Sequence, residues 1–151
     1  MKISQQGIDL IKHFEGCRLT AYQDSVGVWT IGYGSTMGVH KGQTITQEEA
    51  EARLLTDLEP VYKCLYDKIF VLLDQYQYDA LCSWIFNLGC GNFMSSTLRR
   101  LINEGDFIAA QREFGRWIHA GGQVLPGLVK RRAAEAAMFG GDPDATSPLV
   151  A

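Results

Sequence analysis

Three polar side chains with the chemistry of acid–base catalysis lie near the start of the chain. Glu15, Asp24 and Thr30 fall within the glycine-punctuated stretch FEGCRLTAYQDSVGVWTIGYG. Cleavage of a glycosidic bond uses two carboxyl groups, one that protonates the leaving oxygen and one that stays charged. A hydroxyl can hold the attacking water in line. Phe14 beside Glu15 would partly desolvate this acid, which favours its protonated form.

The same residues also have a structural interpretation. Two acids and a threonine at this spacing occur often by chance. Glu15 can cap or pair at a helix end, Asp24 can form an Asx-turn before Gly27, and Thr30 can be an ordinary strand residue. Residue types and spacing alone favour this interpretation over any named enzyme.

The elements that must position these side chains follow from the hydrophobic pattern. A first helix is expected to begin after Ser4 as its N-cap and to end at Gly16, which leaves Glu15 where the helix gives way to a loop. Residues 17–34 break the helical period and predict a hairpin or three-stranded meander. The apolar face of the first helix is Ile3, Gly7, Leu10, Ile11 and Phe14.

The rest of the chain reads as helices. A capping box at Thr46–Glu49 opens a helix that Pro60 should kink or split. Residues 75–88 carry a wide apolar stripe typical of a central buried helix. Short helices are expected after Ser96 or Thr97 and after Asp106, and the last helix from about 128 to 139.

These elements predict an α+β fold that is mainly helical, in one domain over residues 1–151. A small β-containing lobe spans about 15–45, a connecting helix about 46–66, and a helical lobe about 70–140. We expect a cleft between the lobes, which is a natural ligand site. Residues 141–151 are expected to be a mobile tail.

Composition and charge exclude several classes of protein. The chain is 46% hydrophobic and 21% charged, an ordinary balance for a globular protein rather than a disordered one. Its net charge of −3 argues against a dedicated nucleic-acid-binding protein. No apolar run is long enough for a membrane span, and no signal peptide is evident, so we expect a cytosolic protein. The basic half can be a solvated helix surface or a surface that meets an anionic polymer. Its basic residues are Arg99, Arg100, Arg112, Arg116, Lys130, Arg131 and Arg132.

The cysteines give no sign of a metal site. None of the pairs among residues 17, 64, 82 and 90 has the CxxC spacing of zinc or thioredoxin-like motifs. Free thiols are the expectation in a reducing compartment. We expect Cys82 to lie in the core and Cys17 to be a free thiol, and we expect no metal or organic cofactor.

The ordered motifs together resemble the phage-type lysozymes, the endolysins of glycoside hydrolase family 24. The pattern E-x8-D-x5-T, set in FEG…AYxDxxGxWTIGYG, is similar to their catalytic signature. Three further stretches resemble family segments: GQTITQEEAEARLLTDL, QYDALCSWIFNLGCGNFMSSTLRRLI and GLVKRRAAEAAMF. The resemblance covers most of the chain but not the tail after Gly141.

This resemblance implies a lysozyme fold and hydrolysis of the β-1,4 bond between N-acetylmuramic acid and N-acetylglucosamine in peptidoglycan. Glu15 matches the family's general acid, and Asp24 and Thr30 match the pair that positions water. Water attack with inversion predicts carboxyl groups roughly 6.5–9.5 Å apart.

Further positions carry over from the resemblance with competing structural interpretations. Phe86 and Asn87 match a pair that lines the sugar cleft, although they can equally be core and surface residues. Thr97 matches a hydroxyl near the cleft, although it can equally be an N-cap. Arg131 or Arg132 matches a basic residue facing the catalytic glutamate, or else belongs to an exposed basic helix face. Ser35 departs from the pattern, since many relatives have His there.

The resemblance also implies partners and leaves alternatives open. An enzyme of this kind accumulates in the host bacterial cytoplasm and reaches the cell wall after a separate holin-type protein opens the membrane. Independently of the resemblance, we expect a monomer, because the apolar stripes of the helices can all be buried in one core. A lytic transglycosylase would need the acid but no water-positioning pair, so Asp24 and Thr30 favour hydrolysis. A non-catalytic wall-binding module is the alternative from another class, and retention of all three polar residues speaks against it.

Overall fold

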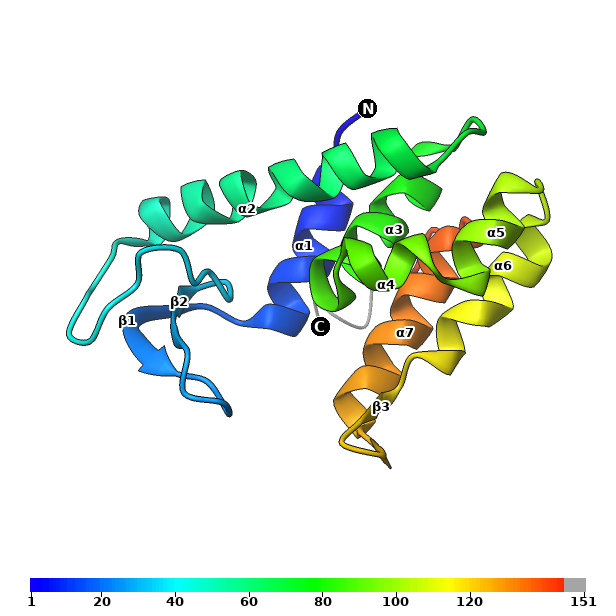
Figure 1. The fold of residues 1–151 in the computed structure, drawn as a ribbon. Coiled ribbons are helices and arrows are strands. Elements are labelled where there is room, and N and C mark those ends of the chain that lie inside the picture. Colours follow the sequence, from blue (N-terminus) through cyan, green and yellow to red (C-terminus); the bar gives the residue numbers. More distant parts are fainter. Residues whose placement is uncertain (146–151) are drawn as a thin grey trace. The chain divides into compact units, whose positions relative to one another are not determined.

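The computed structural model describes residues 1–145 of the chain (Figure 1). Their contacts divide into two compact units, one formed by Lys12–Pro60 and one by Met1–Ile11 together with the chain from Val61 onward. The part of the chain that the structure describes is mainly helical and has a small antiparallel sheet in each unit, which confirms the predicted α+β class.

The unit of residues 12–60 is built around a two-stranded sheet. Strand β1 (Arg18–Gln23) pairs with β2 (Trp29–Gly32), and an irregularity between Arg18 and Tyr22 bends the pairing. A single bridge joins Thr20 to Thr44, so the segment that returns towards α2 touches the sheet without forming a third strand. The predicted hairpin is therefore confirmed and the three-stranded alternative is not.

Helix α2 (Gln47–Lys68) begins at the predicted cap and continues through Pro60. The Thr46 hydroxyl accepts a hydrogen bond from the Glu49 N–H at 3.1 Å, which satisfies one of the exposed donors of the first turn. One of the two expectations was that Pro60 would split the helix, and this expectation is wrong. Its apolar face closes the core of the smaller unit, which consists of Ile31, Tyr33, Ile45, Ala50, Leu54 and Leu58.

Helix α1 (Gln5–Glu15) buries the face predicted for it, with Gly7, Leu10 and Ile11 inside. Ser4 precedes the helix, and its carbonyl accepts the Ile8 N–H at 3.0 Å. The Ser4 hydroxyl and N–H both donate to the buried carboxylate of Asp79. These hydrogen bonds hold the start of α1 against α3 within the larger unit.

Helix α3 (Gln75–Leu88) is the predicted central helix of the larger unit, and every residue from Gln77 to Ile85 is buried. Trp84 lies at its centre with ring centroids 5.7 Å from Phe93 and 5.2 Å from Trp117. Figure 1 shows α7 (Pro126–Phe139), coloured orange, beside α3, and the contacts between these two helices are the most extensive between elements of the unit.

Two of the remaining short helices begin where their N-caps predict. Helix α4 (Cys90–Met94) precedes α5 (Thr97–Asn103), whose N-cap is Ser96, and Ser96 accepts the Arg99 N–H at 3.0 Å. Asp106 caps α6 (Phe107–Glu113) through the Ala109 N–H at 3.1 Å. A 3-10 turn η1 (Phe114–Arg116) and the two-residue strands β3 (His119–Ala120) and β4 (Gln123–Val124) lead to α7.

Helix α7 begins at Pro126 rather than at residue 128 as predicted, because proline is well suited to the first helical position, where no N–H partner is needed. After α7, residues 141–145 form hydrogen-bonded turns, and Ala145 is buried. The rest of the predicted mobile tail lies outside the described residues. Within residues 1–145 no helix has the length and apolar character needed to cross a membrane.

Cys64 in α2 and Cys90 at the start of α4 form a disulfide, which corrects the expectation that all four cysteines are free. These cysteines lie 26 residues apart, and their pairing is a tertiary contact that local sequence could not reveal. The other two expectations hold, since Cys17 is an exposed free thiol and Cys82 a buried one.

Candidate active site

Glu15 is the last residue of α1, where Gly16 turns the chain with a positive φ of 67°. Its carboxylate lies against the backbone of Gly34, just after β2, because a Cβ built on Gly34 would come within 3.0 Å of Glu15 Oε2. Gly34 also has a positive φ, of 82°. A glycine is thus required there by both backbone conformation and space.

Asp24 lies in the turn between β1 and β2 and is exposed. Its Oδ1 accepts the N–H groups of Val26 at 3.0 Å and Val28 at 2.8 Å, so the Asx-turn of the structural interpretation is present. Its Oδ2 makes no hydrogen bond with any other described residue. The turn therefore holds the carboxylate by one oxygen and leaves the second available.

Thr30 lies in β2, opposite Tyr22 of β1, and its hydroxyl donates to the Val28 carbonyl at 2.9 Å. Thr30 is only 4% exposed, so this side chain is buried rather than open to solvent. The hydroxyl proton is committed to Val28, so the remaining capacity of the oxygen is to accept a hydrogen bond.

A second polar group in the same unit surrounds Tyr33, and the sequence interpretation missed it. Glu51 of α2 forms an ion pair with Lys12, while Gln47 donates to Tyr33 Oη at 2.9 Å and to Glu51 Oε1 at 3.0 Å. The hydrogen bond from Lys12, and then that from Gln47, lower the pKa of Glu51, and burial raises the pKa of Tyr33. The spacing of Gln47 and Glu51 on one helix face was the available signal.

Ser35, the departure from the family pattern, is buried and lies in a bridge with Ile31. Arg53 of α2 donates to the Ser35 hydroxyl at 3.4 Å and to the Met37 carbonyl at 3.1 Å. Burial raises the pKa of Asp57, and a hydrogen bond with Ser35 opposes that rise. Polar side chains of α2 thus surround Ser35.

The other predicted site residues belong to the larger unit. Phe86 and Asn87 are half-buried near the end of α3, and Thr97 is the exposed first residue of α5, so the N-cap role falls to Ser96. Arg131 and Arg132 are 4% and 1% exposed, which excludes the interpretation of these two residues as an exposed basic face.

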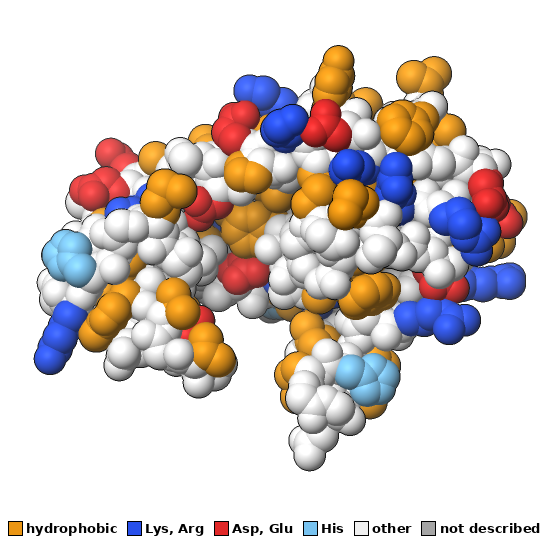
Figure 2. Space-filling view, in the orientation of Figure 1, with side chains coloured by type: hydrophobic (Ala, Val, Ile, Leu, Met, Phe, Trp, Pro, Cys, Tyr) orange, Lys and Arg blue, Asp and Glu red, His pale blue; other side chains and the backbone are white. Residues whose placement is uncertain are grey.

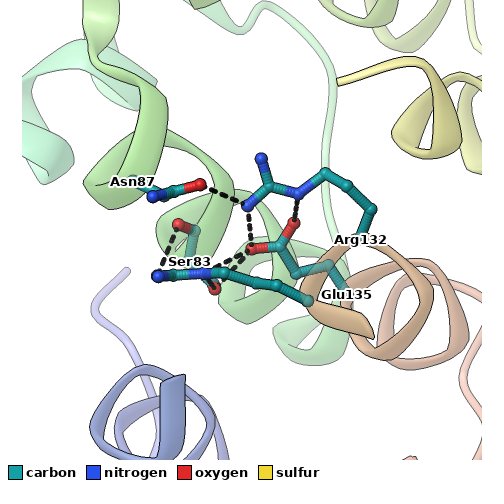
Figure 3. Close-up of polar contacts among 5 residues, drawn as sticks. Ser83, Asn87, Arg132 and Glu135 are labelled. Atoms are coloured by element: carbon teal, nitrogen blue, oxygen red, sulfur yellow. Dashed lines mark hydrogen bonds and ion pairs between the residues drawn. The ribbon is translucent and has the colours of Figure 1, made fainter. Parts of the chain in front are cut away.

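Arg131 and Arg132 both pair with the buried carboxylate of Glu135 on the same helix, and Figure 3 shows Arg132 facing this carboxylate beside Ser83. Glu135 is fully buried and pairs with Arg132 Nε at 2.7 Å, and its Oε2 accepts the Ser83 hydroxyl at 2.5 Å. Arg131 also donates to the Ser83 carbonyl at 3.2 Å. Burial raises the pKa of Glu135, and the charges of Arg132 and Arg131 oppose that rise.

The basic residues that remain at the surface are interspersed with acids. Figure 2 shows Lys and Arg side chains next to Asp and Glu over the region of α5 and α6. Arg100 pairs with Glu104 at 3.0 Å and Arg116 with Glu113 at 2.9 Å. These pairs favour the interpretation as a solvated helix surface. Among residues 1–145, no group of three or more His, Cys, Asp or Glu side chains is arranged to hold a metal ion.

Comparison with known proteins places this arrangement in a family. The model of the phage lysozyme family matches residues 12–135, a range that contains Glu15, Asp24 and Thr30. The chain belongs to the phage lysozyme family. It is therefore a glycoside hydrolase of the lysozyme type, as the resemblance implied.

Similar proteins align with this phage lysozyme over nearly all of its length. It is 48% identical over 143 residues to an endolysin of Acyrthosiphon pisum secondary endosymbiont phage 1, covering 92% of this chain and 98% of the relative. The muramidase domain of SpmX from Asticaccaulis excentricus superimposes with a TM-score of 0.86 at 40% identity, over 91% and 97% of the two chains. The crystal structure of a P22 lysozyme mutant superimposes with a TM-score of 0.85 at 42% identity, over 92% and 98%.

Proposed function

We propose that this lysozyme is an endolysin that hydrolyses the β-1,4 bond between N-acetylmuramic acid and N-acetylglucosamine in bacterial peptidoglycan. Glu15 is the general acid that protonates the glycosidic oxygen as the bond from the anomeric carbon breaks. A water held by Asp24 and Thr30 attacks that carbon from the opposite face and gives its proton to Asp24. The predicted carboxyl separation for inversion stays a prediction.

The single observation that carries this proposal is that Asp24 and Thr30 both form hydrogen bonds with the backbone of Val28. Val28 N–H occupies Asp24 Oδ1 and Val28 C=O occupies the Thr30 hydroxyl proton. Both side chains are thereby left as hydrogen-bond acceptors. A water that donates a proton to each keeps a lone pair for attack, which is the geometry that hydrolysis needs.

Clearing of outer-membrane-permeabilised bacteria tests the assignment of the acid. Glu15→Gln keeps the shape of the side chain but has no proton of suitable acidity to donate, so clearing should fall by at least about 100-fold. Equal clearing by the two proteins would falsify the role of Glu15.

Asp24→Asn tests the water-positioning role. The amide oxygen can still accept the Val26 and Val28 N–H groups, so the turn should persist while the charged acceptor is lost. Asp142 also accepts a backbone N–H two residues on, from Asp144 at 2.9 Å, and is exposed. Asp142→Asn is therefore a matched control that should clear cells like the unmodified protein.

The products distinguish hydrolysis from transglycosylation. Water attack leaves a reducing N-acetylmuramic acid end, whereas a lytic transglycosylase leaves a 1,6-anhydro end of mass lower by one water. Mass spectrometry of digested peptidoglycan should show only reducing ends. Anhydro ends would mean that Asp24 and Thr30 do not deliver water.

Four residues of the larger unit are proposed to support the same reaction. Phe86, Asn87 and Thr97 contact the glycan, and Arg131 supports the acid.

Release requires a separate holin-type hole-forming protein, and the endolysin waits in the host cytoplasm as a monomer. Expression in the cytoplasm should therefore leave a culture growing until a membrane-permeabilising agent is added, after which it should lyse.

A further inference from the structure

Arg132 links a fully buried carboxylate to a half-buried amide on α3 (Figure 3). Its Nε and Nη2 bind the two oxygens of Glu135, at 2.7 and 3.1 Å, and Nη2 also donates to Asn87 Oδ1 at 2.8 Å. Arg132 is 1% exposed and Glu135 is 0% exposed. Asn87 is the most exposed member of this cluster, which also contains Ser83 and Arg131.

Stability is a poor explanation for this cluster. Desolvating a buried ion pair offsets most of its attraction, and well-packed apolar residues in its place are often as stable or more stable. Arg132 Nη1 is also buried and has no hydrogen-bond partner among residues 1–145, which adds a cost. The cluster is better explained by what it holds in position.

The contact with Arg132 fixes which way the Asn87 amide faces. A guanidinium only donates hydrogen bonds, so the Asn87 carbonyl must face it. Figure 3 shows the Asn87 nitrogen pointing away from Arg132. This nitrogen forms no hydrogen bond with any of the described residues, so its two N–H groups remain available at a half-buried position.

We infer that Arg132 is a positioning residue that holds Asn87 as a hydrogen-bond donor for an acceptor oxygen of the bound glycan. The inference rests on the proposed function, because it takes Asn87 to contact the sugar. Without Arg132 the amide is free to turn over and to present its oxygen instead. Glu135 binds two nitrogens of Arg132 and so sets the orientation of the guanidinium that donates to Asn87.

The decisive variant is Asn87→Asp, measured through the affinity for chitotriose in the Glu15→Gln background, where cleavage does not interfere. An aspartate offers Arg132 a charged acceptor, and such hydrogen bonds are stronger than neutral ones. The fold should therefore be as stable as before or more stable. Both donors are lost, so chitotriose binding should weaken by about fivefold or more. A merely structural role for Asn87 would not separate affinity from stability in this way.

A double-mutant cycle tests whether Arg132 acts through Asn87. Arg132→Met should weaken chitotriose binding about as much as Asn87→Ala does, and adding it to Asn87→Ala should change the affinity little further. Arg132→Lys should restore part of the affinity, since the ammonium can still donate to Oδ1. Ile102→Ala, a fully buried change in α5, is the control that lowers stability without altering affinity.

Three results would overturn the inference. Chitotriose binding by Asn87→Asp that is as tight as with Asn87 in place would exclude the donor role. An effect of Arg132→Met that persists in full in the Asn87→Ala protein would mean that Arg132 acts elsewhere. Chitotriose binding that is undetectable in the Glu15→Gln protein would also count against it. Failure of the proposed function is a separate result, because it would appear as equal clearing by the unmodified and Glu15→Gln proteins.

Discussion

Asp24 and Thr30 are joined through one residue, Val28. The Val28 N–H donates to Asp24 Oδ1 at 2.8 Å, and the Val28 carbonyl accepts both the Thr30 hydroxyl and the Asp24 N–H at 2.9 Å. The spacing of the two side chains is thus set by a short, hydrogen-bonded turn and by β2. Small changes at either residue should act on the same acceptor pair.

Thr30→Val should separate the hydroxyl from the volume of the side chain. Valine fills nearly the same buried space but lacks the hydroxyl. The free energy of unfolding should therefore fall by only about 1 kcal/mol, while the rate of clearing falls by about 100-fold. Urea unfolding and clearing rates measure the two effects. Thr30→Ser keeps the hydroxyl and should retain most activity, whereas a Thr30→Val protein with full activity would contradict the role of Thr30.

Gly34→Ala should reduce activity by more than its effect on stability explains. A residue with a side chain is strained at φ 82°, by about 1–2 kcal/mol, and the new Cβ would lie 3.0 Å from Glu15 Oε2. Gly38 has a similar φ of 68° but open space around it. Gly38→Ala should therefore lose similar stability in thermal unfolding but little activity. Equal activity of the two variants would show that Gly34 does not constrain Glu15.

Local signals predicted much of this fold, while tertiary contacts did not show in the sequence. The Thr46, Ser96 and Asp106 caps depend on neighbouring residues, so their helices were predicted within a few positions. The sequence left three roles open for the basic run at Arg131: a solvated helix face, a surface for an anionic polymer, or a residue facing the catalytic glutamate. Only the fold reveals that Glu135 is buried beside it. The pairing of Cys64 with residue 90 is likewise a tertiary contact.

The candidate site shows the same division. Asp24 and its turn follow from a short stretch of sequence, so both the catalytic and the Asx-turn interpretations were available, and the turn is present. The burial of Thr30 depends on packing beneath β2, and the contact of Glu15 with Gly34 joins the end of α1 to the end of β2. Neither depends on residue spacing alone.

Reduction of the Cys64–Cys90 disulfide should destabilise the protein. Closing a loop of this length, a separation of 26 residues, restricts the unfolded chain by roughly 3 kcal/mol. Dithiothreitol should therefore lower the melting temperature, whereas the Cys64→Ser, Cys90→Ser double variant should melt at that lower temperature with or without reductant. The native protein should react quickly with a thiol reagent only at Cys17, because burial raises the pKa of Cys82 well above its usual value.

Glu51 should make a small contribution to stability that disappears in acid. Its pKa is lowered in the folded protein by hydrogen bonds from Lys12 and Gln47. A lowered pKa means that the contribution is complete above the unfolded value, near 4.5, and is lost as the pH falls through the folded value. The difference in unfolding free energy between the unmodified protein and Glu51→Gln should shrink over that range and be weaker at high salt, since Glu51 is partly exposed. A difference that is constant with pH would show that Lys12 and Gln47 do not favour the charged form.

The segment between β2 and α2 has almost no regular secondary structure, yet its backbone is held at both ends. Ile45 N–H donates to the Leu19 carbonyl and Ala21 N–H to the Gln43 carbonyl, each at 2.9 Å, while Arg53 grips the Met37 carbonyl. A protease that cuts after the exposed Lys41 must first pull this segment away from the sheet. The rate of tryptic cleavage at that bond would then report how often the smaller unit opens locally under native conditions.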